Sequence, residues 1–140
     1  MIPYVDSSFL VSLYVTDAHS SEARRRVLSA SHIWLTPLHR AEWAHALAHH
    51  VFRGKLATLD VRQMENELAR DVLAGLWSEI SLPESAFALC ADLARRHGPK
   101  LGVRTLDSLH VACALELKAE KFWTFDERQA KLAKAAGMKT

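Results

Sequence analysis

The sequence predicts an α/β fold in which helices flank a small, mainly parallel central sheet, and three observations support this. Short apolar runs alternate along the chain with longer segments of helical periodicity. Two of the runs end at an aspartate, Asp6 and Asp126, where a helical segment begins at once. The helical segments together also contain clearly more residues than the apolar runs. Because strands joined by helical crossovers normally pair in parallel, the alternation favours a parallel sheet.

The expected strands are the segments 2–5, 32–36, 77–82 and 121–125. Each is short and largely apolar, which is typical of a strand buried in a sheet. Beyond the last expected helix only residues 138–140 remain. Any final edge strand is therefore expected to be very short or missing.

The first expected helices cover residues 7–15 and 20–30, and a third begins at Pro37, which suits a first helical turn, and ends at Gly54. Small and aliphatic residues of the third helix recur at helical spacing, so we expect them on its buried face. These residues are Ala41, Ala44, Leu47 or Ala48, and Val51.

The next expected helix begins at 58–60 and has the apolar stripe Val61, Met64, Leu68 and Val72. The stripe is compatible with a core, a dimer seam or a partner groove, and we expect part of it at an interface. Three further helices follow. They run from 83–85 to a stop at Gly98-Pro99, over 106–117, and over 127–136 before Gly137.

Composition indicates a single globular domain spanning residues 1–140, with 49% hydrophobic and 24% charged residues. The net charge of +2 neither requires nor excludes a phosphate-rich partner. Cys90 and Cys113 lie in apolar helical patterns and are expected to be buried free thiols. There is no leader-like N-terminus and no run near the roughly 20 apolar residues of a membrane span. We therefore expect a cytoplasmic protein without membrane contact.

Candidate chemistry lies in four carboxylates. Asp6 and Asp126 stand at expected strand ends, where open parallel sheets bind ligands, although aspartate is also a favoured helix N-cap. Asp107 and Glu42 stand in the first turns of two helices. Four converging carboxylates would repel one another unless a cation joined them, and Mg²⁺ or Mn²⁺ prefers such oxygen ligands. Spacing alone does not show that the four meet.

The motifs around these acids resemble the PIN-domain ribonuclease family, and most closely its VapC-type toxins. The resemblance spans nearly the whole chain, and its most specific part is the late pair of segments. The matching segments are Tyr4-Val5-Asp6-Ser7-Ser8, Ala41-Glu42-Trp43, Leu106-Asp107-Ser108-Leu109-His110-Val111-Ala112 and Thr124-Phe125-Asp126.

The resemblance implies a three-layer α/β/α fold and an endoribonuclease that uses Mg²⁺ or Mn²⁺ to leave 5′-phosphate and 3′-hydroxyl ends. It assigns catalysis and metal binding to Asp6, Glu42, Asp107 and Asp126, with Ser7 and Thr124 as supporting hydroxyls. It also implies a homodimer, an inhibitory antitoxin of a type II toxin–antitoxin pair, and a structured RNA substrate such as transfer or ribosomal RNA.

Clustered basic residues are the candidates for RNA contact, although a solvated helix face is the better explanation for such a cluster taken alone. They are Arg95, Arg96 and Arg104.

Several other functions remain open on the sequence. A housekeeping PIN nuclease in RNA processing and a non-catalytic PIN-like module that binds RNA or protein share the same motifs. A transition-metal site could use His39, Glu42, His45 and His49 on one helix. A phosphoryl-transfer enzyme of the haloacid-dehalogenase type is disfavoured, because Ser8 stands where its second aspartate is needed.

Overall fold

The computed structural model describes residues 1–140 as four strands and seven helices, and it confirms the predicted α/β alternation. The observed strands lie inside the predicted segments and are shorter than them. The strands are β1 (Pro3–Val5), β2 (Ile33–Leu35), β3 (Trp77–Glu79) and β4 (Lys121–Trp123). The helices are α1 (Ser7–Tyr14), α2 (Ser20–Val27), α3 (Pro37–Phe52), α4 (Thr58–Leu73), α5 (Ser85–Leu101), α6 (Thr105–Glu116) and α7 (Glu127–Ala135).

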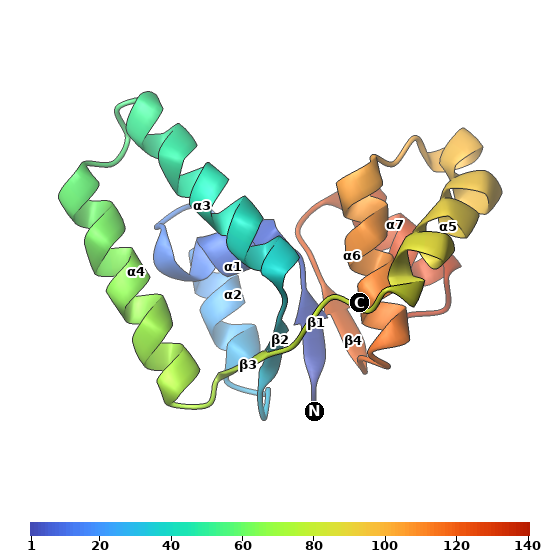
Figure 1. Ribbon diagram of the computed structural model, residues 1–140, viewed down its shortest axis with the longest axis horizontal. Coiled ribbons are helices and arrows are strands. Elements are labelled where there is room, and N and C mark those ends of the chain that lie inside the picture. The colour runs from blue at the N-terminus through green and yellow to red at the C-terminus, as the bar shows by residue number, and fades with distance from the viewer.

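All strand pairing is parallel, as the sequence predicts. β1 pairs with β4 and β2 pairs with β3, while β1 and β2 lie side by side without a shared hydrogen-bond ladder. The spatial order is therefore β3, β2, β1, β4, in the centre of the molecule (Figure 1). Past β4, the Phe122 N–H donates to the Lys139 carbonyl at 2.8 Å. The expected last edge strand is thus reduced to a single backbone hydrogen bond.

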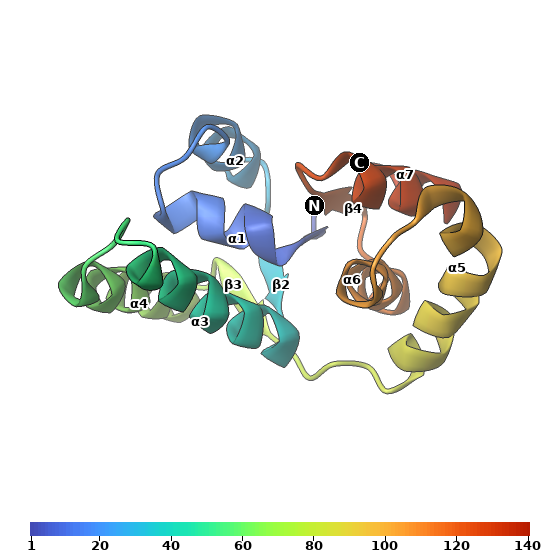
Figure 2. The same ribbon diagram turned by 90° about the horizontal axis from the view of Figure 1, so that it is seen from above.

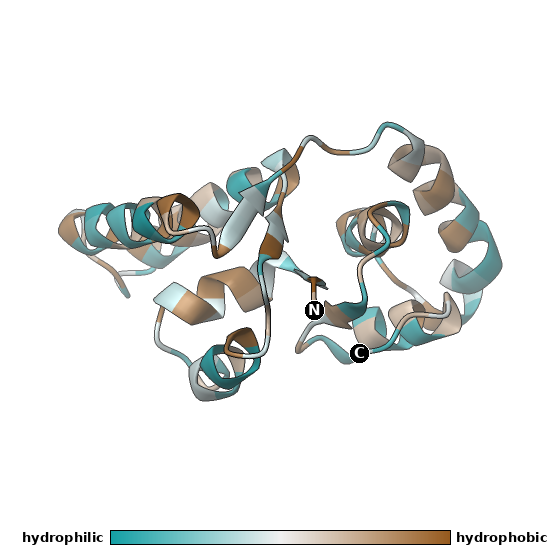
Figure 3. Cartoon of the chain, turned by 90° about the horizontal axis from the view of Figure 1, so that it is seen from below, coloured by the Kyte–Doolittle hydropathy of each residue, from teal (hydrophilic) through white to brown (hydrophobic).

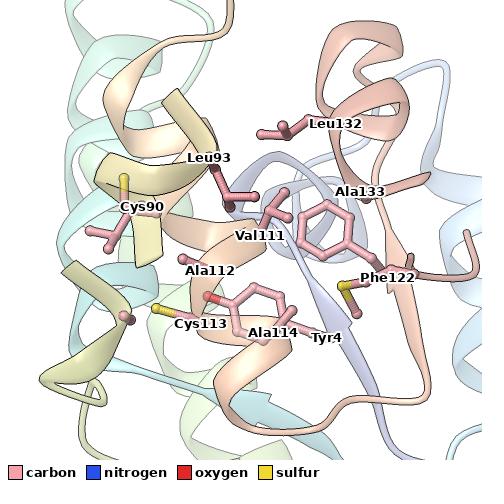
Figure 4. Close-up of a cluster of buried hydrophobic side chains, with 13 residues drawn as sticks. Tyr4, Cys90, Leu93, Val111, Ala112, Cys113, Ala114, Phe122, Leu132 and Ala133 are labelled. Atoms are coloured by element: carbon pink, nitrogen blue, oxygen red, sulfur yellow. The ribbon is translucent and has the colours of Figure 1, made fainter. Parts of the chain in front are cut away.

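The β1–β4 register separates two hydrophobic cores. Tyr4 lies opposite Phe122, and Val5 lies opposite Trp123. Because side chains alternate along a strand, the first pair faces one side of the sheet and the second pair faces the other. Tyr4 and Phe122 pack with residues of α5, α6 and α7 (Figure 4), whereas Val5 and Trp123 pack with α1, α2, α3 and α4.

Helix α6 is enclosed by its neighbours. Seen from above, it lies between the strands, α5 and α7 (Figure 2), and every side chain from Ser108 to Ala114 is buried. A helix buried all round can hold a polar residue in a fixed place far from solvent. None of the helices is long and apolar enough to cross a lipid bilayer.

The predicted buried face of α3 is wrong except at Leu47. The helix instead buries His39, Trp43 and Leu47, and it exposes the alanines and Val51. Turning Trp43 inward removes far more apolar surface from water than turning alanines inward, so tryptophan decides the rotation of the helix.

The predicted stop of α5 at Gly98-Pro99 is also wrong. The helix continues to Leu101 and ends at Gly102, whose positive φ of 64° is the left-handed cap that glycine adopts readily. Gly98 has no Cβ to clash with the Pro99 ring, so the residue before the proline stays helical.

The stripe of α4 serves the core. Leu68 is buried, and Val61, Met64 and Val72 pack against the core that contains Val5. The large exposed apolar side chains of this region lie elsewhere, at Phe52, Leu59 and Leu73. The hydropathy view shows hydrophobic residues alternating with hydrophilic ones along the helices of this side of the molecule, α3 and α4 (Figure 3).

Candidate active site

Asp6 connects the end of β1 to the start of α1. Its Oδ1 accepts a hydrogen bond from the Phe9 N–H at 2.9 Å, which makes it the N-cap, and only 5% of the residue is exposed. Its Oδ2 lies 3.2 Å from the Thr124 hydroxyl. Because β1 and β4 are parallel neighbours, Thr124 and Asp126 leave β4 at the same edge of the sheet as Asp6.

Glu42 is held by two side chains. The Ser7 hydroxyl donates to Glu42 Oε1 at 2.7 Å, and His110 Nε2 contacts the same oxygen. On the far side of the imidazole, the Tyr4 hydroxyl lies 2.8 Å from Nδ1. With Nε2 donating to the carboxylate, Nδ1 accepts from Tyr4, so the histidine joins the buried tyrosine to the glutamate.

His39 fixes the start of α3 against β1. Its Nδ1 accepts from the Thr36 N–H at 3.0 Å, and its Nε2 donates to the Val5 carbonyl at 2.7 Å. Burial lowers the pKa of His39 to about 3, so the ring is neutral at pH 7. His39 thereby positions the turn that carries Glu42.

The transition-metal site considered from the sequence does not form. His39 is buried and fully hydrogen-bonded, whereas His45 is exposed and bonded to the Ala41 carbonyl. The two rings therefore lie on different faces of α3.

Asp107 and Asp126 are more exposed than Asp6. Asp107 stands in the first turn of α6, with its Oδ2 3.5 Å from Arg104 Nε. Asp126 caps α7 by accepting from the Gln129 N–H at 2.8 Å. The buried Gln129 amide also donates to the Asp107 backbone carbonyl at 3.2 Å, which ties α7 to the start of α6.

Asp6 and Asp107 interact electrostatically, because the charge of Asp107 affects the pKa of Asp6. The pKa of Asp6 is raised to about 6, chiefly by burial and in smaller part by the charge of Asp107, while the Phe9 N–H, His110 and Thr124 oppose the rise. Burial also acts to raise the pKa of Glu42, but the contacts with His110 and Ser7 outweigh it and the net shift is downward. Glu42 is thus stabilised as a carboxylate, whereas Asp6 is a buried acid that favours a nearby cation.

Two hollows open over these groups, and Asp126 borders both. One, of about 500 Å³, is lined by Ser7, Glu42 and Phe125 among others, and it contains no lysine or arginine. The other, of about 460 Å³, is lined by Arg104, Asp107 and Arg128 among others. Of the predicted carboxylates, Glu42 therefore lines the first hollow, Asp107 lines the second, and Asp126 lines both.

The donor set fits a hydrated hard cation. The groups near Asp6 are carboxylate and hydroxyl oxygens, which are the ligands of Mg²⁺ and Mn²⁺. No three histidine, cysteine, aspartate or glutamate side chains lie close enough to chelate an ion directly. An ion bound through one or two carboxylates and several waters suits this spacing.

The structure separates the three candidate arginines. Arg104 lies at the rim of the second hollow, beside Asp107. Arg95 and Arg96 lie on the exposed face of α5 and line neither hollow, and Arg95 is paired with Asp92 at 3.1 Å. Arg128, which the sequence did not single out, lies in the hollow with Arg104.

Three polar residues of the site were assigned no role from the sequence, although the first two lie in the quoted motifs: Tyr4, His110 and Gln129. His110 carried a usable signal, because it is the one imidazole in the apolar stripe of α6. Gln129 carried none, since a glutamine in a charged helix normally faces solvent.

Comparison with known proteins bears on the fold. The PIN domain family model matches residues 4–135. The solved structure of VapC20 from Mycobacterium tuberculosis, described as a sarcin-ricin loop cleaving toxin, is similar with a TM-score of 0.70 and 17% identity. The alignment covers 97% of this chain and 95% of that one. The search of curated proteins finds no significant match.

Proposed function

The chain belongs to the PIN domain family, and from this premise we propose that it is a metal-dependent endoribonuclease acting as the toxin of a type II toxin–antitoxin pair. The observation that carries the proposal is the acidic edge at the ends of β1 and β4. There a buried aspartate lies with a glutamate fixed by Ser7 and His110, and with two aspartates that are more exposed than the first. The last three line two hollows that share Asp126.

Asp6, Glu42, Asp107 and Asp126 would hold the Mg²⁺ or Mn²⁺ ion, one or two of them directly and the others through its bound waters. Such an ion would lower the pKa of a water molecule bound to it and would neutralise charge on the phosphate. The protein residues act around it. Thr124 lies beside Asp6 and donates more closely to Gln129 Oε1, at 2.8 Å, whereas Ser7 and His110 orient Glu42.

Arg104 and Arg128 place positive charge beside the hollow that contains Asp107. This suits a phosphodiester, whose charge must be balanced when the 3′ oxygen leaves. Hydrolysis would give 5′-phosphate and 3′-hydroxyl ends, with no covalent enzyme intermediate.

The partners we propose are a structured RNA, a second copy of the chain, and an antitoxin. The likeness to VapC20, a toxin that cleaves the sarcin-ricin loop, supports a ribosomal RNA target. Phe52, 88% exposed, and Leu73, 89% exposed, are large apolar side chains of the kind that protein partners cover.

The test is cleavage of total cellular RNA by the purified protein with Mg²⁺ or Mn²⁺, with EDTA, and with Asp107→Asn. Discrete fragments that need both the ion and Asp107 support the proposal, and mapping their ends identifies the target. Asp92→Asn is the matched control, because Asp92 is exposed and pairs only with Arg95 on α5.

Calorimetry of divalent-ion binding separates the remaining outcomes. Absence of cleavage together with absence of ion binding would contradict the nuclease and favour a non-catalytic binding module. Cleavage without an adjacent antitoxin gene would keep the nuclease and favour a role in RNA processing.

A further inference from the structure

A stack of aromatic rings borders the first hollow. Phe125 lies nearly parallel to Phe9, with ring centroids 5.3 Å apart and 10° between planes. It lies as nearly parallel to His19, at 4.3 Å and 7°. Phe9 in turn stacks on Trp123 at 5.7 Å. The rings run from the buried Trp123 outward to His19, which is exposed.

Hydrogen bonds hold the backbone that carries the outermost ring. His19 lies in the segment between α1 and α2, and its N–H donates to Asp17 Oδ1 at 2.8 Å. The Ser12 hydroxyl donates to the other oxygen of Asp17 at 2.7 Å. The Arg26 guanidinium lies 5.6 Å from the Phe125 centroid and steadies the ring below. An aromatic ring ordered in advance loses little conformational entropy when it binds a ligand.

The two hollows on either side of Asp126 differ in what they can bind. The second contains Arg104 and Arg128, which suit phosphate. The first contains Asp17, Glu42 and Asp126 and no lysine or arginine, so away from an ion held at Glu42 and Asp126 it disfavours phosphate. Its aromatic wall suits an uncharged, planar group instead.

From this division we infer that His19 is a stacking platform for an unpaired RNA base next to the scissile phosphate. The inference rests on the proposed ribonuclease function and narrows its substrate to single-stranded or looped-out RNA. Bases inside a duplex have no free face to offer, whereas splayed bases stack on histidine and other aromatic side chains. Stacking tolerates any base, so the platform selects for an unpaired state more than for base identity.

The test uses Asp107→Asn protein, so that binding is measured without cleavage. The probe is an unstructured oligoribonucleotide that carries 2-aminopurine, and the same strand in a duplex is the comparison. We expect His19→Ala to weaken binding of the single strand about 5- to 100-fold and to leave the duplex unchanged. His19→Phe should restore affinity to within about threefold and quench 2-aminopurine, because it keeps a stacking ring.

His45→Ala is the matched control, since His45 is exposed on α3 and lines neither hollow. Binding by His19→Ala equal to that of His45→Ala, or no rescue by a folded His19→Phe protein, would overturn the stacking platform. Failure of the parent to bind the single strand would also overturn it.

The same His19 and His45 substitutions are then made in protein that retains Asp107. Cleavage of total RNA by these variants distinguishes the stacking platform from the nuclease. Unchanged metal-dependent cleavage and KM in His19→Ala would overturn the platform and leave the nuclease standing. Single-strand binding that depends on His19, without any cleavage, would support the platform and overturn the nuclease.

Discussion

The Glu42 side and the Asp107 side of the acidic edge are held in opposite ways. Glu42 is fixed by Ser7 and by His110, which is itself held by Tyr4 in the core beneath the sheet. The Asp107 side chain is as exposed as that of Glu42, 29% in both, but its carboxylate contacts only the exposed Arg104, and the Asp126 carboxylate accepts only the Gln129 N–H. The first side is therefore set by folding, whereas the second is free to respond to an ion and a substrate.

This difference separates stability from activity. A change on the Glu42 side should disturb the fold together with the reaction, because its polar groups are buried in one connected network. A change on the Asp107 side should disturb the reaction almost alone. Four predictions test the separation.

The largest expected effect is at Asp107, in the cleavage rate. Asp107→Asn keeps the shape of the side chain and removes its charge, so we expect metal-dependent cleavage to fall about a thousandfold or more. The free energy of unfolding should change by less than about 1 kcal/mol, the range of a carboxylate at a helix N-terminus. Rate assays and urea unfolding of the same samples measure both. Full activity of Asp107→Asn would remove Asp107 from the site.

The next effect is at His110, in the free energy of unfolding. His110→Phe fills the volume but leaves the Tyr4 hydroxyl without its partner and Glu42 without its buried donor. We expect the free energy of unfolding of His110→Phe to be about 3 to 4 kcal/mol lower than that of the wild type. His45→Phe, at an exposed site on α3, is the control and should change little. Equal stability of the two variants would show that the buried network does not stabilise the Glu42 side.

The third effect is the pH dependence contributed by Asp6 in metal-free protein. Its pKa rises from 3.8 to about 6 on folding, so the folded state binds an extra proton between these values. The stability that this acid contributes is full below about pH 4 and is lost as the pH rises through 6. A shift of 1 pKa unit corresponds to about 1.4 kcal/mol. The free energy of unfolding of Asp6→Asn should therefore rise by about 2 to 3 kcal/mol relative to that of the wild type between pH 4 and 7.

The quantity to measure is the difference in free energy of unfolding between Asp6→Asn and the wild type at each pH. This difference is needed because His39, which is neutral in the folded protein, makes stability depend on pH in the opposite direction. Its pKa falls to about 3 on folding, so its contribution to stability is lost as the pH falls below about 6.5. Saturating Mg²⁺ should abolish the Asp6 difference if the ion binds there, since a cation favours the carboxylate. A constant difference across the pH range in EDTA would contradict the raised pKa.

Sequence patterns predicted the order of elements and the parallel pairing because both depend on local hydrophobic periodicity. They failed for the rotation of α3, where one tryptophan outweighed several alanines. They also failed for the end of α5, where Gly98 tolerates helical backbone before proline. Both failures reflect energies that depend on neighbours, which periodicity does not contain.

The same limit applies to the site. The strand-end aspartates could be found because the topology of a parallel sheet gathers strand ends at one edge. The links from Tyr4 through His110 to Glu42 could not, because they join β1, α6 and α3 across more than 60 residues of sequence each. Only the folded packing of α6 brings these groups into contact.

The smallest expected effect is at Arg104, in the salt dependence of RNA binding. Arg104 is exposed and lies in the hollow with Asp107, so Arg104→Gln should weaken RNA binding only a few-fold, by about 3- to 10-fold near physiological salt. The slope of log affinity against log salt should fall by about 1, as expected when one phosphate contact is lost. Arg95→Gln is the matched control, because Arg95 pairs with Asp92 on α5 and lines neither hollow. An equal fall in slope for the two variants would mean that RNA extends over α5, and the basic side of the site would then be wider than the hollow beside Asp107.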